Sequence, residues 1–175
     1  LNVLNNCQFG GNYSFIYPAH NTVTGEAFIQ MTLPEINSGV TYRKFPLCET
    51  IDYIRYRCGT RFYEFQPARD LPILLSRCKD PQMKAQLMSL FVDPSGAPSS
   101  DPGTLIMPLI LPWSVWHSDR LSQPIKHGNR GGGLMDNSRI ADNLVIEVQF
   151  RSGPDACSGA PTFSTASDLG SLALV

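Results

Sequence analysis

The stretch that most constrains the fold runs from Thr50 to Arg69. It holds two runs typical of β-strands, Ile51–Arg57 and Thr60–Gln66, which are separated by Cys58 and Gly59. Aromatic and β-branched side chains are frequent in both runs, and such side chains pack well on a pleated surface. Arg and Glu fall on both nominal faces, so the alternation is irregular. Gly59 indicates a bend or bulge between two extended pieces that need further strands as neighbours.

Three other segments also predict strands. The clearest pattern is in Asn143–Arg151, where apolar and polar residues alternate along the run. Glu26–Leu33 alternates in the same way, with only Phe28 breaking the rule, so we expect one buried and one wet face. A shorter strand is predicted over Asn12–Tyr17, where Pro18 stops it.

Four segments are less decisive. A short helical turn fits the region around Leu47–Tyr53, whereas Leu71–Lys79 is compatible with loop, helix or strand. Gln82–Val92 contains good helix formers, but its end runs into a turn, and we favour a strand. Thr104–Leu111 is apolar on both faces, and Pro108 places it towards a sheet edge or a bulge.

Composition sets the fold class. The 14 Pro and 14 Gly are spread along the 175 residues, as expected for many short strands joined by loops. No repeat of fixed period and no alternation of strands with helices is visible. We therefore predict an all-β protein, an antiparallel eight-stranded jelly-roll sandwich with long loops and extended termini.

The predicted organisation is one domain with two extended ends. Residues 1–11 are assigned to an N-terminal arm, residues 12–151 to the jelly-roll domain and residues 152–175 to a C-terminal tail rich in Ser, Gly and Ala. The segment Leu1–Cys7 is neither basic nor apolar enough for a signal peptide, and no apolar run approaches a membrane span. A net charge of −1 supplies no global field for nucleic acid or an anionic membrane.

The sequence offers little chemistry. Its five cysteines are odd in number and irregularly spaced, which favours reduced thiols over a disulfide framework. The three histidines are not near paired cysteines, so neither a metal nor another cofactor is expected. His117, Ser118 and Asp119 contain a base, a nucleophile and an acid, but consecutive residues cannot easily form a catalytic relay. We predict that the chain is not an enzyme, and a hydrolase using His117 and Ser118 is the least favoured hypothesis.

Basic side chains gather in two places. Arg55, Arg57 and Arg61 are candidates for contacts with RNA phosphates if their sheet face points towards RNA. Cross-strand pairing of these arginines with nearby carboxylates is an equally good interpretation; the carboxylates are Glu49, Asp52 and Glu64. Lys126, His127 and Arg130 lie in a Gly-rich loop that could touch phosphate, although a solvated loop is the simpler interpretation.

The apolar run Thr104–Trp116 predicts a covered surface. A small β domain has difficulty burying both faces of such a run, and large apolar patches usually mark subunit contacts. The candidate interface residues are Leu105, Met107, Leu109, Leu111, Trp113 and Trp116. Cover by a second sheet or by the C-terminal tail remains an open alternative.

These motifs resemble a known family. The stretch IDYIRYRCGTRFYEF resembles the aromatic-rich run that enters a long strand in coat proteins of picorna-like viruses. QLMSLFVDPSG, TLIMPLILPWSVW and NLVIEVQF are similar to later strands of that fold. The size is similar to that of the smallest coat protein of the plant cheraviruses, in the family Secoviridae.

The resemblance implies a structural role. Such a chain is expected to assemble with sister coat proteins into an icosahedral capsid around a positive-strand RNA genome, in the virion and in the host cell cytoplasm. Contacts with genomic RNA are expected to be weak and non-specific, because no basic arm precedes the first strand. The alternative is a β-sandwich binding module that recognises carbohydrate or a protein partner.

Overall fold

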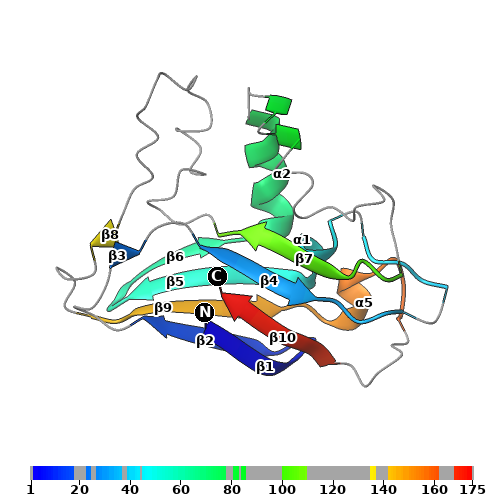
Figure 1. Cartoon of the computed structure of the whole chain (residues 1–175), viewed down its shortest axis with the longest axis horizontal. Helices are drawn as coiled ribbons and strands as arrows, with labels where there is room; N and C mark the ends of the chain where they lie inside the picture. The colour runs from blue at the N-terminus through cyan, green and yellow to red at the C-terminus, as the bar shows by residue number, and fades with distance from the viewer. Residues whose placement is uncertain are drawn as a thin grey trace.

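The computed structural model describes residues 2–17, 23–24, 27–36, 39–43, 45–77, 81–82, 84–85, 100–109, 135–136, 142–161 and 168–174. The described strands form two four-stranded antiparallel sheets (Figure 1). In spatial order, sheet A contains β1 (Asn2–Gln8), β10 (Asp168–Leu174), β4 (Phe28–Thr32) and β7 (Thr104–Pro108). Sheet B contains β2 (Asn12–Tyr17), β9 (Leu144–Phe150), β5 (Ile51–Cys58) and β6 (Arg61–Phe65). A small third sheet pairs β3 (Val23–Thr24) with β8 (Met135–Asp136).

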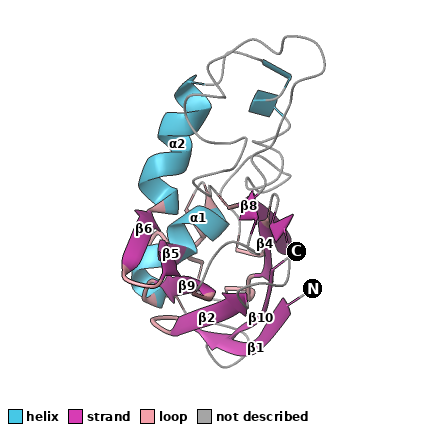
Figure 2. Ribbon diagram, turned by 90° about the vertical axis from the view of Figure 1, so that its left-hand side faces the viewer, coloured by secondary structure: helices cyan, strands magenta, loops and turns pink. Residues whose placement is uncertain are grey.

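The strand pairs are nested along the chain. The outermost pair joins β1 to β10, and the next pairs join β2 to β9, β3 to β8 and β4 to β7. The innermost pair joins β5 to β6. The described chain is therefore one long antiparallel hairpin whose tip lies in the stretch Thr50–Arg69. Two further ladders, β10 with β4 and β9 with β5, roll this hairpin into two layers (Figure 2).

The core lies between the two sheets. Strand β9 alternates strictly between buried and half-buried residues, so Leu144, Ile146, Val148 and Phe150 face inward as the sequence predicts. Ile29 and Met31 of β4 are fully buried on the facing layer. This packing removes apolar surface from water on one face of each sheet, and it confirms the predicted antiparallel sandwich.

A β-bulge explains the irregular alternation of the central stretch. In the ladder between β5 and β9 the register shifts between Ile51 and Tyr53. The extra residue is Asp52, which is exposed, and Ile51 and Ile54 both point inward although three positions separate them. A simple period of two therefore fails at this bulge.

Gly59 makes the tip of the hairpin possible. Cys58 pairs with Arg61, so only Gly59 and Thr60 form the turn. Gly59 has φ of 58°, and a Cβ atom at this position would collide with the carboxylate of Asp142. Glycine avoids both the strained backbone and the collision. The predicted bend is thus a two-residue hairpin turn.

The named helices α1, α2 and α5 accompany the sheets, and the described residues 81–82 and 84–85 are also helical. Helix α1 (Pro46–Thr50) is the expected helical turn, and α5 (Gly153–Ala156) lies beside it at one end of the sandwich (Figure 1). Helix α2 (Pro67–Arg77) rises away from the sheets (Figure 2). Among the described residues, no helix is long and apolar enough to cross a membrane.

Helix formation decides one open assignment and corrects one sequence expectation. The ambiguous segment Leu71–Lys79 is helical where it is described, because Pro67 starts the helix and Leu71 and Leu75 bury one face. The strand favoured over Gln82–Val92 is wrong at Gln82, Lys84 and Ala85, which are helical. Intrinsic helix propensity decides these positions; residues 86–92 lie outside the described chain.

Both chain ends differ from the predicted arm and tail. Asn2–Gln8 and Asp168–Leu174 are β1 and β10, and they pair with each other in sheet A. Cys7 and Leu169 are fully buried. Each strand is too poor in large apolar residues to be recognised alone, and pairing across more than 150 positions is not visible in a local pattern.

Replacing Ile146 by Asp is expected to unfold the domain. Its side chain is fully buried in the middle of β9, and an unpaired charge there costs about 4 kcal/mol or more. Thermal unfolding followed by circular dichroism measures the effect. The matched control is Val145→Asp on the half-buried outer side of the same strand, which we expect to cost much less. Equal melting of Ile146→Asp and wild type would show that the inward face is misassigned.

Replacing Tyr56 by Phe is expected to leave stability unchanged or to raise it. In the described structure the buried Tyr56 hydroxyl has no hydrogen-bond partner, and an unsatisfied buried group costs about 1–3 kcal/mol. Chemical denaturation measures the change. The control is Tyr42→Phe, which removes a 2.7 Å hydrogen bond to the Pro34 carbonyl and is expected to destabilise by about 1 kcal/mol. A loss of stability in Tyr56→Phe as large as that in Tyr42→Phe would contradict the conclusion that the Tyr56 hydroxyl has no hydrogen-bond partner.

Candidate functional site

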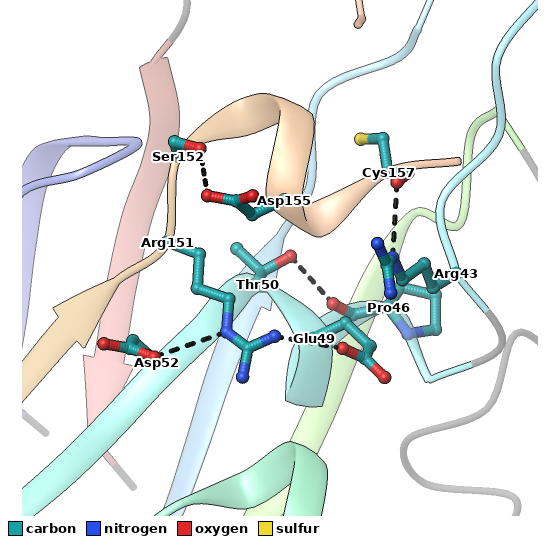
Figure 3. A network of polar contacts seen from close by, with 9 residues as sticks. All are labelled: Arg43, Pro46, Glu49, Thr50, Asp52, Arg151, Ser152, Asp155 and Cys157. Carbon is teal, nitrogen blue, oxygen red and sulfur yellow. Dashed lines mark hydrogen bonds and ion pairs between the residues drawn. The ribbon is translucent and has the colours of Figure 1, made fainter. Parts of the chain in front are cut away.

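A polar network closes the end of the sandwich where α1 and α5 meet (Figure 3). Arg151, which follows β9, lies between two carboxylates. Its Nη1 is 3.3 Å from Glu49 Oε2, and its Nε is 3.5 Å from Asp52 Oδ1. The β-bulge exposes Asp52 at this end, and α1 supplies Glu49. One guanidinium thus ties a helix and two sheet strands together.

The second cation of the network has no carboxylate partner among the described residues. Arg43 donates from Nε to the Cys157 carbonyl at 3.3 Å, and this holds the segment after Tyr42 against the segment after α5. Ser152 donates to Asp155 at 2.5 Å, and Thr50 donates to the Pro46 carbonyl at 2.7 Å. These bonds satisfy side chains at the ends of both short helices.

The network lines an open, mostly polar cavity of about 430 Å³. Its lining consists of Arg43, Asp52, Phe150, Arg151, Ser152 and Asp155. Two cations and two anions meet there, so the cavity suits a small polar group better than a strongly charged one. Within the described ranges, no group of three His, Cys, Asp or Glu side chains is placed to hold a metal ion.

The predicted RNA-contacting arginines lie on the outer face or at the tip of sheet B. Arg55 forms a 2.9 Å ion pair with Glu64 and a 3.6 Å pair with Glu147. Arg57 lies 3.4 Å from the same Glu147. Arg61 is exposed at the turn and pairs with no carboxylate in the described part of the chain. The predicted cross-strand ion pairing is present between Arg55 and Glu64. Glu49 and Asp52 pair with Arg151 instead.

Aromatic rings also hold Arg55. Its guanidinium lies 4.8 Å from the ring centre of Tyr53 and 5.3 Å from that of Phe62. The hydrogen bond to Glu64 raises the pKa of Arg55, and cation–π contacts favour the charged form. These contacts hold the Arg55 guanidinium on the outer face of sheet B.

The apolar run Thr104–Trp116 contains some residues that are buried and others that lie outside the described part of the chain. Leu105, Met107 and Leu109 are buried in the domain's own core, where β7 pairs with β4 at the edge of sheet A. The alternative that the apolar run is covered within the chain itself therefore holds for these three residues. Leu111, Trp113 and Trp116 lie outside the described residues, as do the catalytic candidates His117 and Ser118 and the loop with Lys126, His127 and Arg130.

Sequence reasoning missed an exposed apolar group. Ile16 and Phe62 expose 59% and 65% of their surfaces, and both point outward from sheet B. The alternation in Asn12–Tyr17 could have indicated Ile16, because Phe15 beside it faces inward. Nothing local indicates that strands 46 positions apart share one face.

Four buried side chains have raised pKa values. Burial raises the pKa of the Cys157 thiol to about 11, although the nearby Arg43 guanidinium lowers it. Burial also raises the pKa of Cys48, Tyr42 and Tyr56 above their ordinary values. All four groups are therefore held in their neutral forms.

Comparisons with known proteins give no relative in sequence. No protein family and no curated protein matches the chain. The crystal structure of the mavirus major capsid protein is similar over 97% of this chain and 43% of that one, with 11% identity and a TM-score of 0.49. The cryo-EM structure of the Sputnik virophage is similar over 99% and 45%, with 14% identity and a TM-score of 0.49. The chain spans less than half of either, and its fold is defined by its own strand pairing.

Alkaline pH is expected to destabilise the fold. An unfolded chain ionises its thiols near pH 8.5 and its phenols near pH 10, whereas the buried groups stay neutral. The raised pKa values therefore make their full contribution to the stability of the folded state below about pH 8.5. This contribution is lost as the pH rises. Melting temperatures measured from pH 6 to 11 should be flat at first and fall above about pH 9.

The matched variant is Cys48→Ala, which removes one of the ionising groups. Its melting temperature is lower at neutral pH, because a buried side chain is lost, but its decline with pH is shallower. A wild-type melting temperature that stays constant up to pH 11 would contradict the neutral, buried assignment.

Proposed function

We propose that this chain is a jelly-roll coat protein that forms the capsid of a small icosahedral positive-strand RNA virus. The observation that carries the proposal is the nested pairing of β1 with β10, β2 with β9, β4 with β7 and β5 with β6. We expect a long hairpin rolled into two four-stranded sheets from an eight-stranded jelly roll, with the short β3–β8 pair as an addition, and this pairing supports the proposal. Viral capsid domains are a principal group of proteins with this architecture.

In this proposal the partners are sister coat proteins of the same capsid. The capsid in this proposal is divided among several chains, as in the plant cheraviruses, with this chain in the virion and its assembly in the host cell cytoplasm. Leu111, Trp113 and Trp116 are the subunit-contact residues that remain from the apolar run. They continue the chain beyond the buried edge strand β7, and large aromatic side chains are common at protein interfaces.

Contact with genomic RNA is weak in this proposal. Arg61 and Arg57 are the best candidates for this RNA contact, because Arg61 is exposed at the hairpin tip and half of the Arg57 side chain is exposed. Arg55 contributes little, since two carboxylates already neutralise it. The proposal assigns no catalysis to the chain.

A binding module is the second candidate, and the polar cavity favours it. Carbohydrate-binding lectins share the jelly-roll architecture. Side chains such as Asp52, Ser152 and Arg43 can exchange hydrogen bonds with sugar hydroxyls in a cavity of about 430 Å³. Such a module is expected to be a monomer or small oligomer that behaves well alone.

The mass of the native assembly separates the two candidates. Material that contains this chain is purified from its source, and its mass is determined by sedimentation and electron microscopy. The capsid proposal predicts a megadalton-sized particle that holds this chain and sister coat proteins in equal number. A small species without co-purifying chains would overturn it and favour the binding module.

A further inference from the structure

The outer face of sheet B carries a row of four residues, three of them apolar, that crosses all four strands. The register aligns one outward residue from each strand, in the order Ile16, Val145, Arg57 and Phe62. Ile16 and Phe62 are at the two ends of the row and are largely exposed, while Val145 is half-buried. Exposed apolar groups framed by polar side chains are typical of protein contact surfaces.

The next outward row carries the charges. Its members, strand by strand, are Ser14, Glu147, Arg55 and Glu64. Glu147 forms ion pairs with Arg55 and Arg57, and Glu64 pairs with Arg55. The two arginines and two glutamates of both rows cancel, so a nucleic acid phosphate would have to displace carboxylates. A neutral protein surface therefore fits this face better than RNA does.

The order of residues in both rows makes the face complementary to itself. Consider a two-fold axis parallel to the strands, midway between β9 and β5, that brings a second copy face to face. The axis reverses the strand order and keeps each row in place. Ile16 then opposes Phe62 of the second copy, and Glu147 opposes Arg55 of the second copy. In the same arrangement Val145 faces Arg57 and Ser14 faces Glu64. Each contact occurs twice, as an isologous interface requires.

We infer that this face binds a second copy of the same chain, with the two outer faces of sheet B packed against each other. Apolar ends meet apolar ends and opposite charges meet across the axis, whereas a rotation that aligned identical residues would oppose like charges. The strands of the two sheets run in the same direction, and twisted sheets pack in this way at a small angle. This inference does not rest on the capsid proposal, and it leaves Arg61 as the RNA-contacting arginine of that proposal.

The size of the face sets the expected affinity. Four strands about 4.8 Å apart, each with about five residues, cover an area of roughly 250–300 Å² in the plane before side-chain relief is counted. The two copies together bury roughly 500–600 Å² by this count, which is below the area of most specific protein contacts. We therefore expect a weak, reversible dimer with a dissociation constant of about 0.1 mM.

The test is sedimentation equilibrium of the 175-residue chain over a concentration series. Wild type should associate reversibly to a dimer, and Phe62→Glu should weaken association by about tenfold or more, because a charge would face Ile16 of the second copy twice. Both positions are exposed, so circular dichroism should report folded variants, with at most a small loss of melting temperature in Phe62→Glu from its contact with Arg55. A wild-type monomer at about 1 mM, or an unchanged dimer of Phe62→Glu, overturns the inference.

Mixing two variants tests the two-fold arrangement itself. Ile16→Lys and Phe62→Glu should each dimerise poorly, whereas an equimolar mixture should form a mixed dimer that has one Lys–Glu contact and one native contact. The matched control is Ile73→Lys mixed with Ile73→Glu, because Ile73 is 45% exposed on α2, away from this face. That mixture should show no preference for mixed dimers. Absence of preference in the first mixture overturns the proposed arrangement.

Discussion

Strand β9 is the element on which the fold depends, because it pairs on both sides. It joins β2 through six aligned residue pairs and joins β5 along almost its whole length. The first ladder belongs to the nested hairpin, and the second closes that hairpin into a layer. Without the ladder to β5, the tip of the hairpin would be separate from the strands that cover it. Its buried side chains then meet those of β4 across the core.

Local pattern was sufficient where a strand is long, regular and half-buried. The strands at Asn12–Tyr17 and Leu144–Phe150 follow the sequence expectation, and so does the turn at Gly59. Local pattern failed where distant residues decide the structure. β1 and β10 are recognisable only as a pair, and the bulge at Asp52 exists because β5 must match β9. The helical residues near Gln82 follow helix propensity, which the expectation of an all-β chain underestimates.

The candidate sites show the same division. Basic and acidic residues that are close together in the sequence predict RNA contacts and ion pairs equally well. The strand register places Arg55 opposite Glu64, and this favours the ion pair. The apolar run around Met107 gave no sign of which residues fill the core. The network around Arg151 and the row from Ile16 to Phe62 depend on which strands lie side by side. Neither could be predicted without the sheet order.

The fold requires β9 to lie between β2 and β5, and nuclear Overhauser contacts test this position most directly. In an antiparallel ladder the backbone protons of directly opposed residues lie close together. The strand order predicts cross-peaks from Ile146 to Phe15 on one side and to Tyr56 on the other. Contacts to only one of these neighbours, or contacts from Ile146 to backbone protons of β4 or β10, would contradict the rolled hairpin and the functions proposed from it.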